Sequence, residues 1–221
     1  MNKMTGNGKL FTTIGIAGMI LLTLTKIVPS SQIAGFSVFV GIAFFFIEEA
    51  VSKTKGDASG LRFHTLWADM KKPGVILWVL LPVISAVITF YFGNLLFHEE
   101  YVIHLFGRTD QFLSFDRLPL MVGQVVIAAF GEEIAYRGFF LGKGMKHLPF
   151  WLCALLSSAV FAAGHIAVGS IWLVVFDIAM VYIDSIIYSI IYRKCANCVV
   201  STISHILGNA TGIIAMLCIS R

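Results

Sequence analysis

Residues Val75–Phe97 read VILWVLLPVISAVITFYFGNLLF, a run without a single charged side chain. A helix needs about 20 mostly apolar residues to cross the hydrocarbon core of a bilayer, and this run is long enough. Similar apolar blocks fill most of the chain, and short polar loops separate them. The pattern predicts an all-α, polytopic transmembrane helix bundle with seven spans. These spans are Leu10–Val28, Ile33–Ile47, Val75–Phe97, Leu120–Leu141, Phe150–Ala167, Ile171–Tyr192 and Val199–Ile219.

The composition also favours a membrane protein. Of the 221 residues, 58% are hydrophobic and 13% are charged. In an ordinary soluble domain, about a quarter of the residues are charged. We therefore expect a single integral membrane domain over residues 1–221. The segment Leu61–Met70 has Phe63 and Trp67 one helical turn apart, which is typical of an interfacial helix. An eighth span results if an amphipathic segment such as this one inserts.

The net charge of +4 does not form a nucleic-acid footprint, because the basic residues lie between apolar blocks rather than in a stripe. Most lysines and arginines outside the spans fall in the amino-terminal tail and in the segments 52–72, 142–149 and 192–198. The positive-inside rule then predicts a cytoplasmic amino terminus, at the cell membrane if the chain is prokaryotic. No clear cleavage site follows the first apolar run, so we expect a retained span rather than a signal peptide.

The fourth predicted span contains the stretch AAFGEEIAYRGFF, residues 128–140. A charge at the bilayer centre costs at least about 2.5–3.5 kcal/mol, so it needs a partner, a cavity or a function. Glu133 and Arg137 are spaced i, i+4, with the acid first, which favours a salt bridge. Glu132 is rotated by about 100° from Glu133 and is placed like a general base. The alternative is that all three residues only hold helices together.

Two further spans carry polar groups. FAAGH ends at His165, and SHILGNATG places His205 and Asn209 on one helix face. Each could be a structural hydrogen bonder between helices. Taken together with Glu132, however, they supply a carboxylate, two imidazoles and an amide. Such a set, if it meets in one cavity, can activate water and stabilise the oxyanion of amide hydrolysis.

The three motifs EE-x3-R, F-x3-H and H-x3-N follow one another on separate spans. In this order they resemble the CAAX-processing and bacteriocin-processing protease family, called CPBP or Abi, to which the Ras-converting endopeptidase belongs. The similarity covers about Leu120 to Gly212, so the protease-like motif core is expected at about 120–212. The resemblance implies an intramembrane endopeptidase that acts on a membrane-associated peptide or protein.

The family's site residues carry over to this chain by position. The implied catalytic group is Glu132, His165, His205 and Asn209, and the implied supporting pair is Glu133 and Arg137. The first acid resembles the water-activating glutamate, and the first histidine resembles its partner at the water. The second histidine and the amide resemble the oxyanion donors.

The resemblance implies a metal-independent glutamate protease more than a metalloprotease, and no H-E-x-x-H motif is present. We therefore expect no required cofactor. Zinc is the alternative, because two histidines and one glutamate can bind it together with water. Its ligands would be Glu132, His165 and His205, one from each of three helices.

Other polar residues have no place in the family pattern. Asp177 and Asp184 lie seven residues apart in the sixth predicted span. They could line the substrate cavity or contact Arg137 or Arg193. Cys195 and Cys198 form a C-x-x-C, for which we expect a reduced, structural role rather than a redox site or half of a zinc site.

Two other functions remain open for this sequence. The chain could be a non-catalytic immunity or scaffold protein of the same family, with the same residues in structural roles. It could also be a proton-coupled transporter that uses Asp177, Asp184 and Glu132 as a relay, although the internal symmetry expected of a transporter is missing from the sequence. The expected partners are a peptide or protein substrate and the lipid bilayer. If the chain is prokaryotic, peptide maturation, leader removal or immunity to a bacteriocin fits better than a prenylated substrate.

Overall fold

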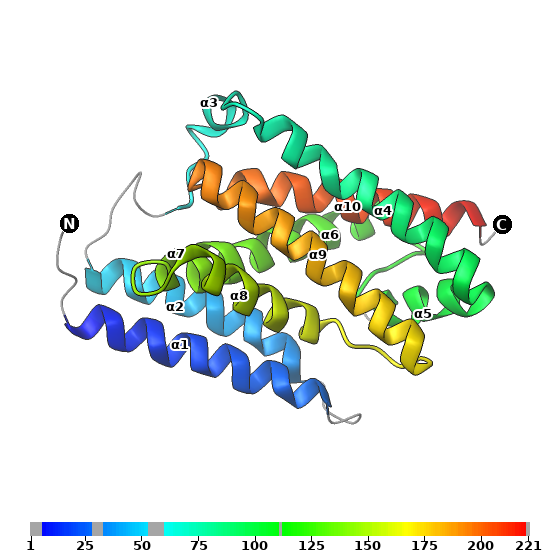
Figure 1. Cartoon of the computed structure of the whole chain (residues 1–221), viewed down its shortest axis with the longest axis horizontal. Helices are drawn as coiled ribbons and strands as arrows, with labels where there is room; N and C mark the ends of the chain where they lie inside the picture. Colours follow the sequence, from blue (N-terminus) through cyan, green and yellow to red (C-terminus); the bar gives the residue numbers. More distant parts are fainter. Residues whose placement is uncertain (1–5, 28–32, 53–59, 111, 220–221) are drawn as a thin grey trace.

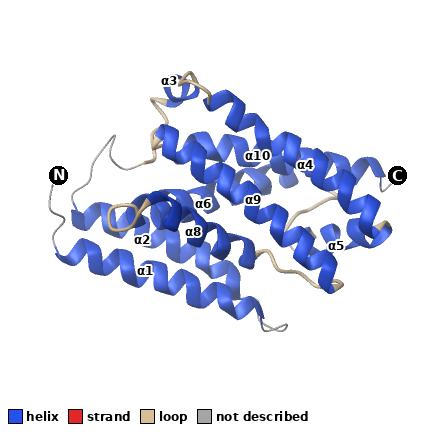
Figure 2. Cartoon of the chain, viewed as in Figure 1, coloured by secondary structure: helices blue, strands red, loops and turns tan. Residues whose placement is uncertain are grey.

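The computed structural model describes residues 6–27, 33–52, 60–110 and 112–219. These residues form helices and no strand, which confirms the predicted all-α class (Figure 2). Val28, the predicted end of the first span, and residues 53–59 of the predicted loop 52–72 lie outside the described residues. In chain order the elements are α1 (Gly6–Leu24), η1 (Thr25–Ile27), η2 (Ile33–Gly35), α2 (Phe36–Ser52), α3 (Leu66–Met70), α4 (Val75–Phe97), α5 (Glu99–Thr109), α6 (Leu118–Glu133), η4 (Ile134–Leu141), α7 (Gly142–Gly144), α8 (Phe150–Gly164), α9 (Ile171–Cys195) and α10 (Cys198–Ile219).

Among the described residues, five helical stretches are long and apolar enough to cross a membrane. They are Ile33–Val51, Val75–Phe97, Leu118–Gly144, Ile171–Cys195 and Cys198–Cys218. Two further apolar helices, Gly8–Leu24 and Phe150–Gly164, are shorter. The count of seven spans therefore stays a prediction.

The helices form two groups with η4 between them (Figure 1). On one side α1 packs against α2, and on the other side α4 packs against α9 and α10. The central helix α6 contacts α10, and its continuation η4 contacts α2 and α8. Residues on α6, η4, α8 and α10 are thereby brought together in the middle of the bundle.

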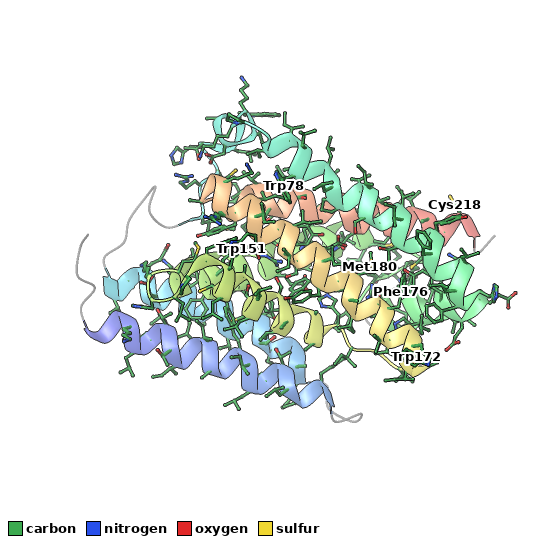
Figure 3. All side chains as sticks on the ribbon, viewed as in Figure 1. Trp78, Trp151, Trp172, Phe176, Met180 and Cys218 are labelled. Atoms are coloured by element: carbon green, nitrogen blue, oxygen red, sulfur yellow. The ribbon has the colours of Figure 1, made fainter. Side chains whose placement is uncertain are left out.

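The outer surface of the bundle carries large apolar side chains. Leu77 is 72% exposed, and Ile127 and Trp172 are each 74% exposed; Trp172 lies near the amino-terminal end of α9 (Figure 3). Exposed apolar side chains are favourable in contact with lipid tails, so this surface is consistent with an integral membrane protein.

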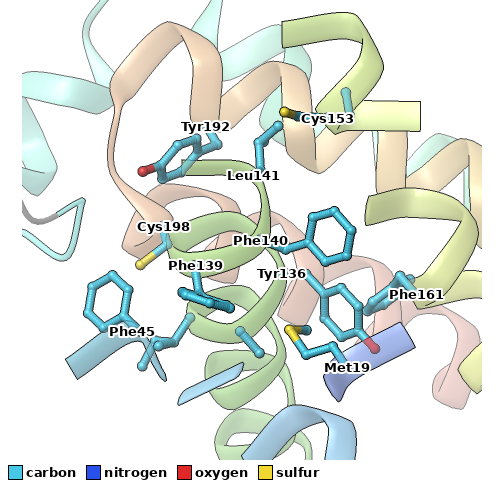
Figure 4. Packing of buried hydrophobic residues seen from close by; sticks show 13 residues of the cluster. Met19, Phe45, Tyr136, Phe139, Phe140, Leu141, Cys153, Phe161, Tyr192 and Cys198 are labelled. Carbon is cyan, nitrogen blue, oxygen red and sulfur yellow. The ribbon is translucent and has the colours of Figure 1, made fainter. Parts of the chain in front are cut away.

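The main hydrophobic core surrounds η4. Figure 4 shows Phe139 of η4 in this core, together with Phe45 of α2 and Phe161 of α8. Helix α2 approaches η4 closely because Gly41 has no side chain, and a Cβ there would lie 2.6 Å from the Cβ of Ala135. The core therefore holds η4 tightly against its neighbours.

The segment η4 is a π-helix, whereas the sequence predicted one regular helix through Leu120–Leu141. All eight of its residues are buried, and it begins directly after Glu133. π-Helical turns are rare and are often found at functional sites. The irregularity thus adjoins the charged motif of the fourth predicted span.

The segment His98–Pro119, between the third and fourth predicted spans, is expected to be a loop, but it contains helix α5. This helix is amphipathic, with Tyr101, His104 and Leu105 buried along one face. Such spacing favours a helix that lies along the bundle, but the charged residues of this segment favour a loop when the sequence is considered alone.

The second predicted span ended before two acids, yet α2 continues to Ser52. Glu48 is fully buried, and the Nζ atoms of Lys143 and Lys146 lie 2.7 and 2.8 Å from its two carboxylate oxygens. These lysines follow η4, so the acid is neutralised by a distant segment that local sequence does not reveal.

Hydrogen bonds connect the segment before α4 to the turn between α9 and α10. Asn197 is fully buried and donates to the carbonyl oxygen of Arg62 and to Asp69. Burial alone would raise the pKa of Asp69, but hydrogen bonds from Lys72, Asn197 and Thr65 lower it to about 2. The predicted interfacial helix Leu61–Met70 is helical only over its second half, as α3.

Candidate active site

The salt bridge expected between Glu133 and Arg137 is present at the centre of the bundle. Both side chains have no exposed surface, and Arg137 Nη1 donates to Glu133 Oε1 over 2.9 Å. Each charge therefore has a direct counter-charge within the packed interior of the bundle. The pair satisfies the condition under which a span tolerates ionised groups.

Arg137 has further partners on α8 and α9. Its Nη2 donates to the carbonyl oxygen and to the hydroxyl of Ser185, at 2.9 and 2.6 Å. The guanidinium also lies 4.8 Å from the ring centre of Phe161 and 5.1 Å from that of Tyr188. These contacts hold the cation in one orientation by hydrogen bonds and cation–π attraction.

His205 connects the two acids of the motif. Its Nδ1 lies 3.1 Å from Glu133 Oε1, and its Nε2 lies 3.6 Å from Glu132 Oε2. The imidazole is stacked on Tyr188, with ring centres 4.7 Å apart. The fourth and seventh predicted spans therefore meet at this histidine, as the motif order had led us to expect.

Glu132 differs from Glu133 in exposure. The side chain of Glu132 is 22% exposed, whereas that of Glu133 has no exposed surface. Glu133 contacts both Arg137 and His205, whereas the only ion pair of Glu132 among the described residues is the longer one to His205. The structure thus separates one engaged acid from one accessible acid.

His165 lies where α8 ends. Its Nδ1 is 2.8 Å from the carbonyl oxygen of Phe161, and a carbonyl can only accept, so Nδ1 carries the proton. The Phe161 ring is 4.6 Å from the ring centre of His165 and 5.8 Å from that of His205. One aromatic ring therefore contacts both histidines of the predicted site.

Asn209 is the site residue that the structure joins least to the others. It is exposed and follows His205 by one turn of α10. No hydrogen bond links its side chain to Glu132, His165 or His205 within the described part of the chain. Its role as a donor to the oxyanion therefore stays a prediction.

The alternative zinc site is not assembled in this structure. Within the described residues, no group of three His, Cys, Asp or Glu side chains could hold a metal ion. The proposed ligands Glu132, His165 and His205 thus do not fit zinc in this arrangement, and the predicted independence of a metal stays a prediction.

Asp177 contacts neither Arg137 nor Arg193, the partners that the sequence suggested. Arg108 of α5 donates to both of its carboxylate oxygens at 2.6 Å, and His104 Nε2 lies 3.2 Å from it. His104 Nδ1 bonds the carbonyl oxygen of Val168, in the loop that follows His165. The hydrogen bond to Asp177 raises the pKa of His104, which favours the doubly protonated ring that this bridge requires.

Asp184 likewise makes no ion pair with Arg137 or Arg193 among the described residues. Cys195 and Cys198 are free and buried. Cys195 places its thiol 3.8 Å from the carbonyl oxygen of Asp69. Both cysteines lie at the packed turn between α9 and α10, and their structural role stays a prediction.

Sequence reasoning missed the residues that support the charged pair. Ser185 binds Arg137 and also donates to Ser158 of α8 at 2.9 Å. The ring of Tyr188 stacks against the imidazole of His205. The available signal was a set of hydroxyl residues inside apolar spans, which often marks close helix contacts.

Residues 114–211 match the family model described as Type II CAAX prenyl endopeptidase Rce1-like. No curated protein and no solved structure matches the chain. The matched segment contains all three motifs, and together with the apolar helices it shows an integral membrane protein. Residues 114–211 are therefore similar to the Rce1-like type II CAAX prenyl endopeptidases, in agreement with the resemblance that the three motifs carry.

Proposed function

We propose that the chain is an intramembrane endopeptidase of the glutamate type, with Glu132 as the base that activates water. The observation that carries this proposal is the contrast between the two adjacent acids. Glu133 is fully buried and engaged by Arg137 and His205, whereas Glu132 is 22% exposed and beside His205. A base must reach both water and substrate, and only the accessible acid can do so.

His165 is the proposed partner at the water. Because its Nδ1–H donates to the Phe161 carbonyl oxygen, the neutral ring has its free lone pair on Nε2. That atom can accept a hydrogen bond from water and orient it. The backbone contact fixes the tautomer, as such contacts do in other catalytic histidines.

His205 and Asn209 are the proposed donors to the oxyanion. Nδ1–H of His205 faces Glu133, so Nε2 can donate only when the ring carries both protons. The carboxylates near both ring nitrogens supply the counter-charge for that cation. Asn209 adds an amide donor from the next turn of the same helix.

The proposed reaction is a hydrolysis with a single tetrahedral intermediate. Glu132 takes a proton from water, and the hydroxide adds to the carbonyl carbon of the scissile bond. His205 and Asn209 hold the oxyanion by hydrogen bonds. Protonated Glu132 then gives its proton to the leaving amine as the C–N bond breaks, which regenerates the carboxylate.

The proposed substrate is a peptide or protein segment at the membrane. The family description names CAAX prenyl endopeptidases, so a peptide with a prenylated cysteine near its carboxyl end is the first substrate to test. A peptide without a prenyl group is the second. We also propose that the amino terminus faces the cytoplasm, because the basic segments 142–149 and 192–198 lie at the end of the bundle where α1 begins (Figure 1).

The test uses purified protein in liposomes with one CAAX peptide, farnesylated or unmodified, and with a set of single-span peptides. Mass spectrometry reads the new peptide ends. We expect wild-type protein to cleave at least one peptide and Glu132→Gln to lose about 10²–10⁴-fold in rate. The matched control Glu99→Gln changes an exposed acid of α5 and should cleave like wild type.

A Glu132→Gln variant that cuts as fast as wild type would refute the mechanism. Wild-type protein that cuts none of these peptides would instead favour the non-catalytic immunity or scaffold function. Transport by the same liposomes, abolished by Glu132→Gln, would favour the proton-coupled transporter.

A further inference from the structure

A hollow lies between α4, α8 and α9, near the residues where α4 and α8 begin and α9 ends. Its volume is about 410 Å³. It is lined by Trp78, Phe150, Trp151, Ile190, Arg193 and Lys194. None of these residues belongs to the proposed catalytic group, so this hollow is a separate feature of the fold. Figure 3 labels Trp78 and Trp151 in this region.

Arg193 is oriented by the aromatic wall of the hollow. Its guanidinium lies 4.4 Å from the ring centre of Phe150 and 5.9 Å from that of Trp151. Stacking of this kind holds a cation in place while its N–H groups stay available to an anion. Arg193 forms no ion pair with a carboxylate among the residues that the structure describes.

Lys194 provides a second cation at the same rim. Its Nζ lies 3.9 Å from the position that a Cβ on Gly74 would occupy, so the ammonium reaches the turn that starts α4. It is exposed and, within the described ranges, has no carboxylate partner. Two adjacent cations without counter-charges therefore face one hollow.

The place of the hollow in the bundle decides what can fill it. It lies among apolar helices, at the end of the bundle where α1 begins (Figure 1). The segments 142–149 and 192–198, which are rich in lysine and arginine, lie at the same end. Tryptophan and arginine at such a place are typical of the membrane interface. A ligand there meets two cations at its polar end and the apolar surfaces of Ile190 and Trp78 at its other end.

We propose that this hollow binds an anionic phospholipid, with the headgroup phosphate held by Arg193 and Lys194. A phosphate ester matches the planar donors of arginine and the point charge of lysine. An acyl chain matches the aromatic and aliphatic walls. Basic pockets between spans on the cytoplasmic side are suited to anionic headgroups.

The test measures lipid retention by native mass spectrometry. The purified chain is equilibrated in neutral detergent with equal amounts of phosphatidylglycerol and phosphatidylcholine. We expect wild-type protein to retain phosphatidylglycerol preferentially. One basic residue near an anionic surface is worth about fivefold in affinity, so R193Q/K194Q should lower retention by roughly 30-fold.

The matched control is K9Q/K71Q, which removes the same charge from two exposed residues outside the hollow. It should retain phosphatidylglycerol like wild type, and so should the charge-conserving K194R. Equal loss in both double variants would overturn the proposal, because it would show general surface attraction. Displacement of the lipid by inorganic phosphate alone would also overturn it, because the site would then take a free anion.

Discussion

The sharpest consequence of the structure concerns Glu133, whose removal should harm stability more than the removal of its neighbour. In Glu133→Gln the Arg137 cation stays buried without a counter-charge. Removing one partner of a buried ion pair costs about 3–5 kcal/mol. The amide oxygen can still accept the bond from Arg137, so we expect about 3 kcal/mol, at the lower end of this range.

For a chain of this length, about 3 kcal/mol corresponds to a fall of roughly 6–12 °C in the midpoint of thermal unfolding. Glu132→Gln is the matched comparison, because it makes the same chemical change one residue away. Its side chain is 22% exposed and outside the Arg137 pair, so the expected change is within about 0.5 kcal/mol. Tryptophan fluorescence during heating in detergent measures both variants.

The double variant Glu133→Gln/Arg137→Met tests the physical cause. It removes the unpaired cation as well, so part of the lost stability should return. Equal unfolding midpoints for Glu133→Gln and Glu132→Gln would refute the reasoning. So would a double variant that is less stable by the sum of the two single changes, because the buried charge would then not be the source of the cost.

Other predictions concern single residues. His165→Ala should lower the rate of peptide cleavage about 10²-fold or more, with a normal elution profile in size-exclusion chromatography. Asn209→Ala should lower kcat about 10²–10³-fold while the unfolding midpoint stays unchanged, because the side chain is exposed; an unchanged kcat would remove it from the mechanism. The pKa of Asp69 is about 2 against an ordinary 3.8, so its ionisation stabilises the fold fully above about pH 4 and progressively less as the pH falls towards 2. Asp69→Asn should therefore weaken the dependence of the free energy of unfolding on pH between about 4 and 2. An unchanged pH dependence in this variant would contradict the prediction.

The apolar spans could be read from the sequence because lipid imposes a simple rule on length and hydropathy. Val75–Phe97 has the same limits in the sequence prediction and in the structure. The ends of other helices could not be predicted, because they depend on distant partners. Helix α2 continues past the buried Glu48, whose carboxylate is paired with Lys143 and Lys146. Both lysines follow η4 and are far from Glu48 in the sequence.

The same distinction holds for the candidate site. The Glu133–Arg137 pair was predictable, because both residues lie on one helix at a spacing with known geometry. The bond between His205 and Glu133 joins residues that are 72 positions apart, and no spacing rule reports it. The π-helix was equally hidden, since its buried apolar residues also suit a regular helix.

The supporting groups explain how this chain can hold Glu133 and Arg137 inside the bundle while Glu132 stays accessible. Arg137 is held by Glu133 and Ser185, so its charge and two of its donor nitrogens are used within the fold. If Glu132 shared that cation, it would become a second structural acid and a weaker base. Because the cation faces Glu133 instead, Glu132 is left with His205 and an exposed edge. Under the proposed mechanism, this arrangement keeps Glu132 accessible as the base. In a non-catalytic scaffold the same acid would only add the cost of an ionisable group in a membrane.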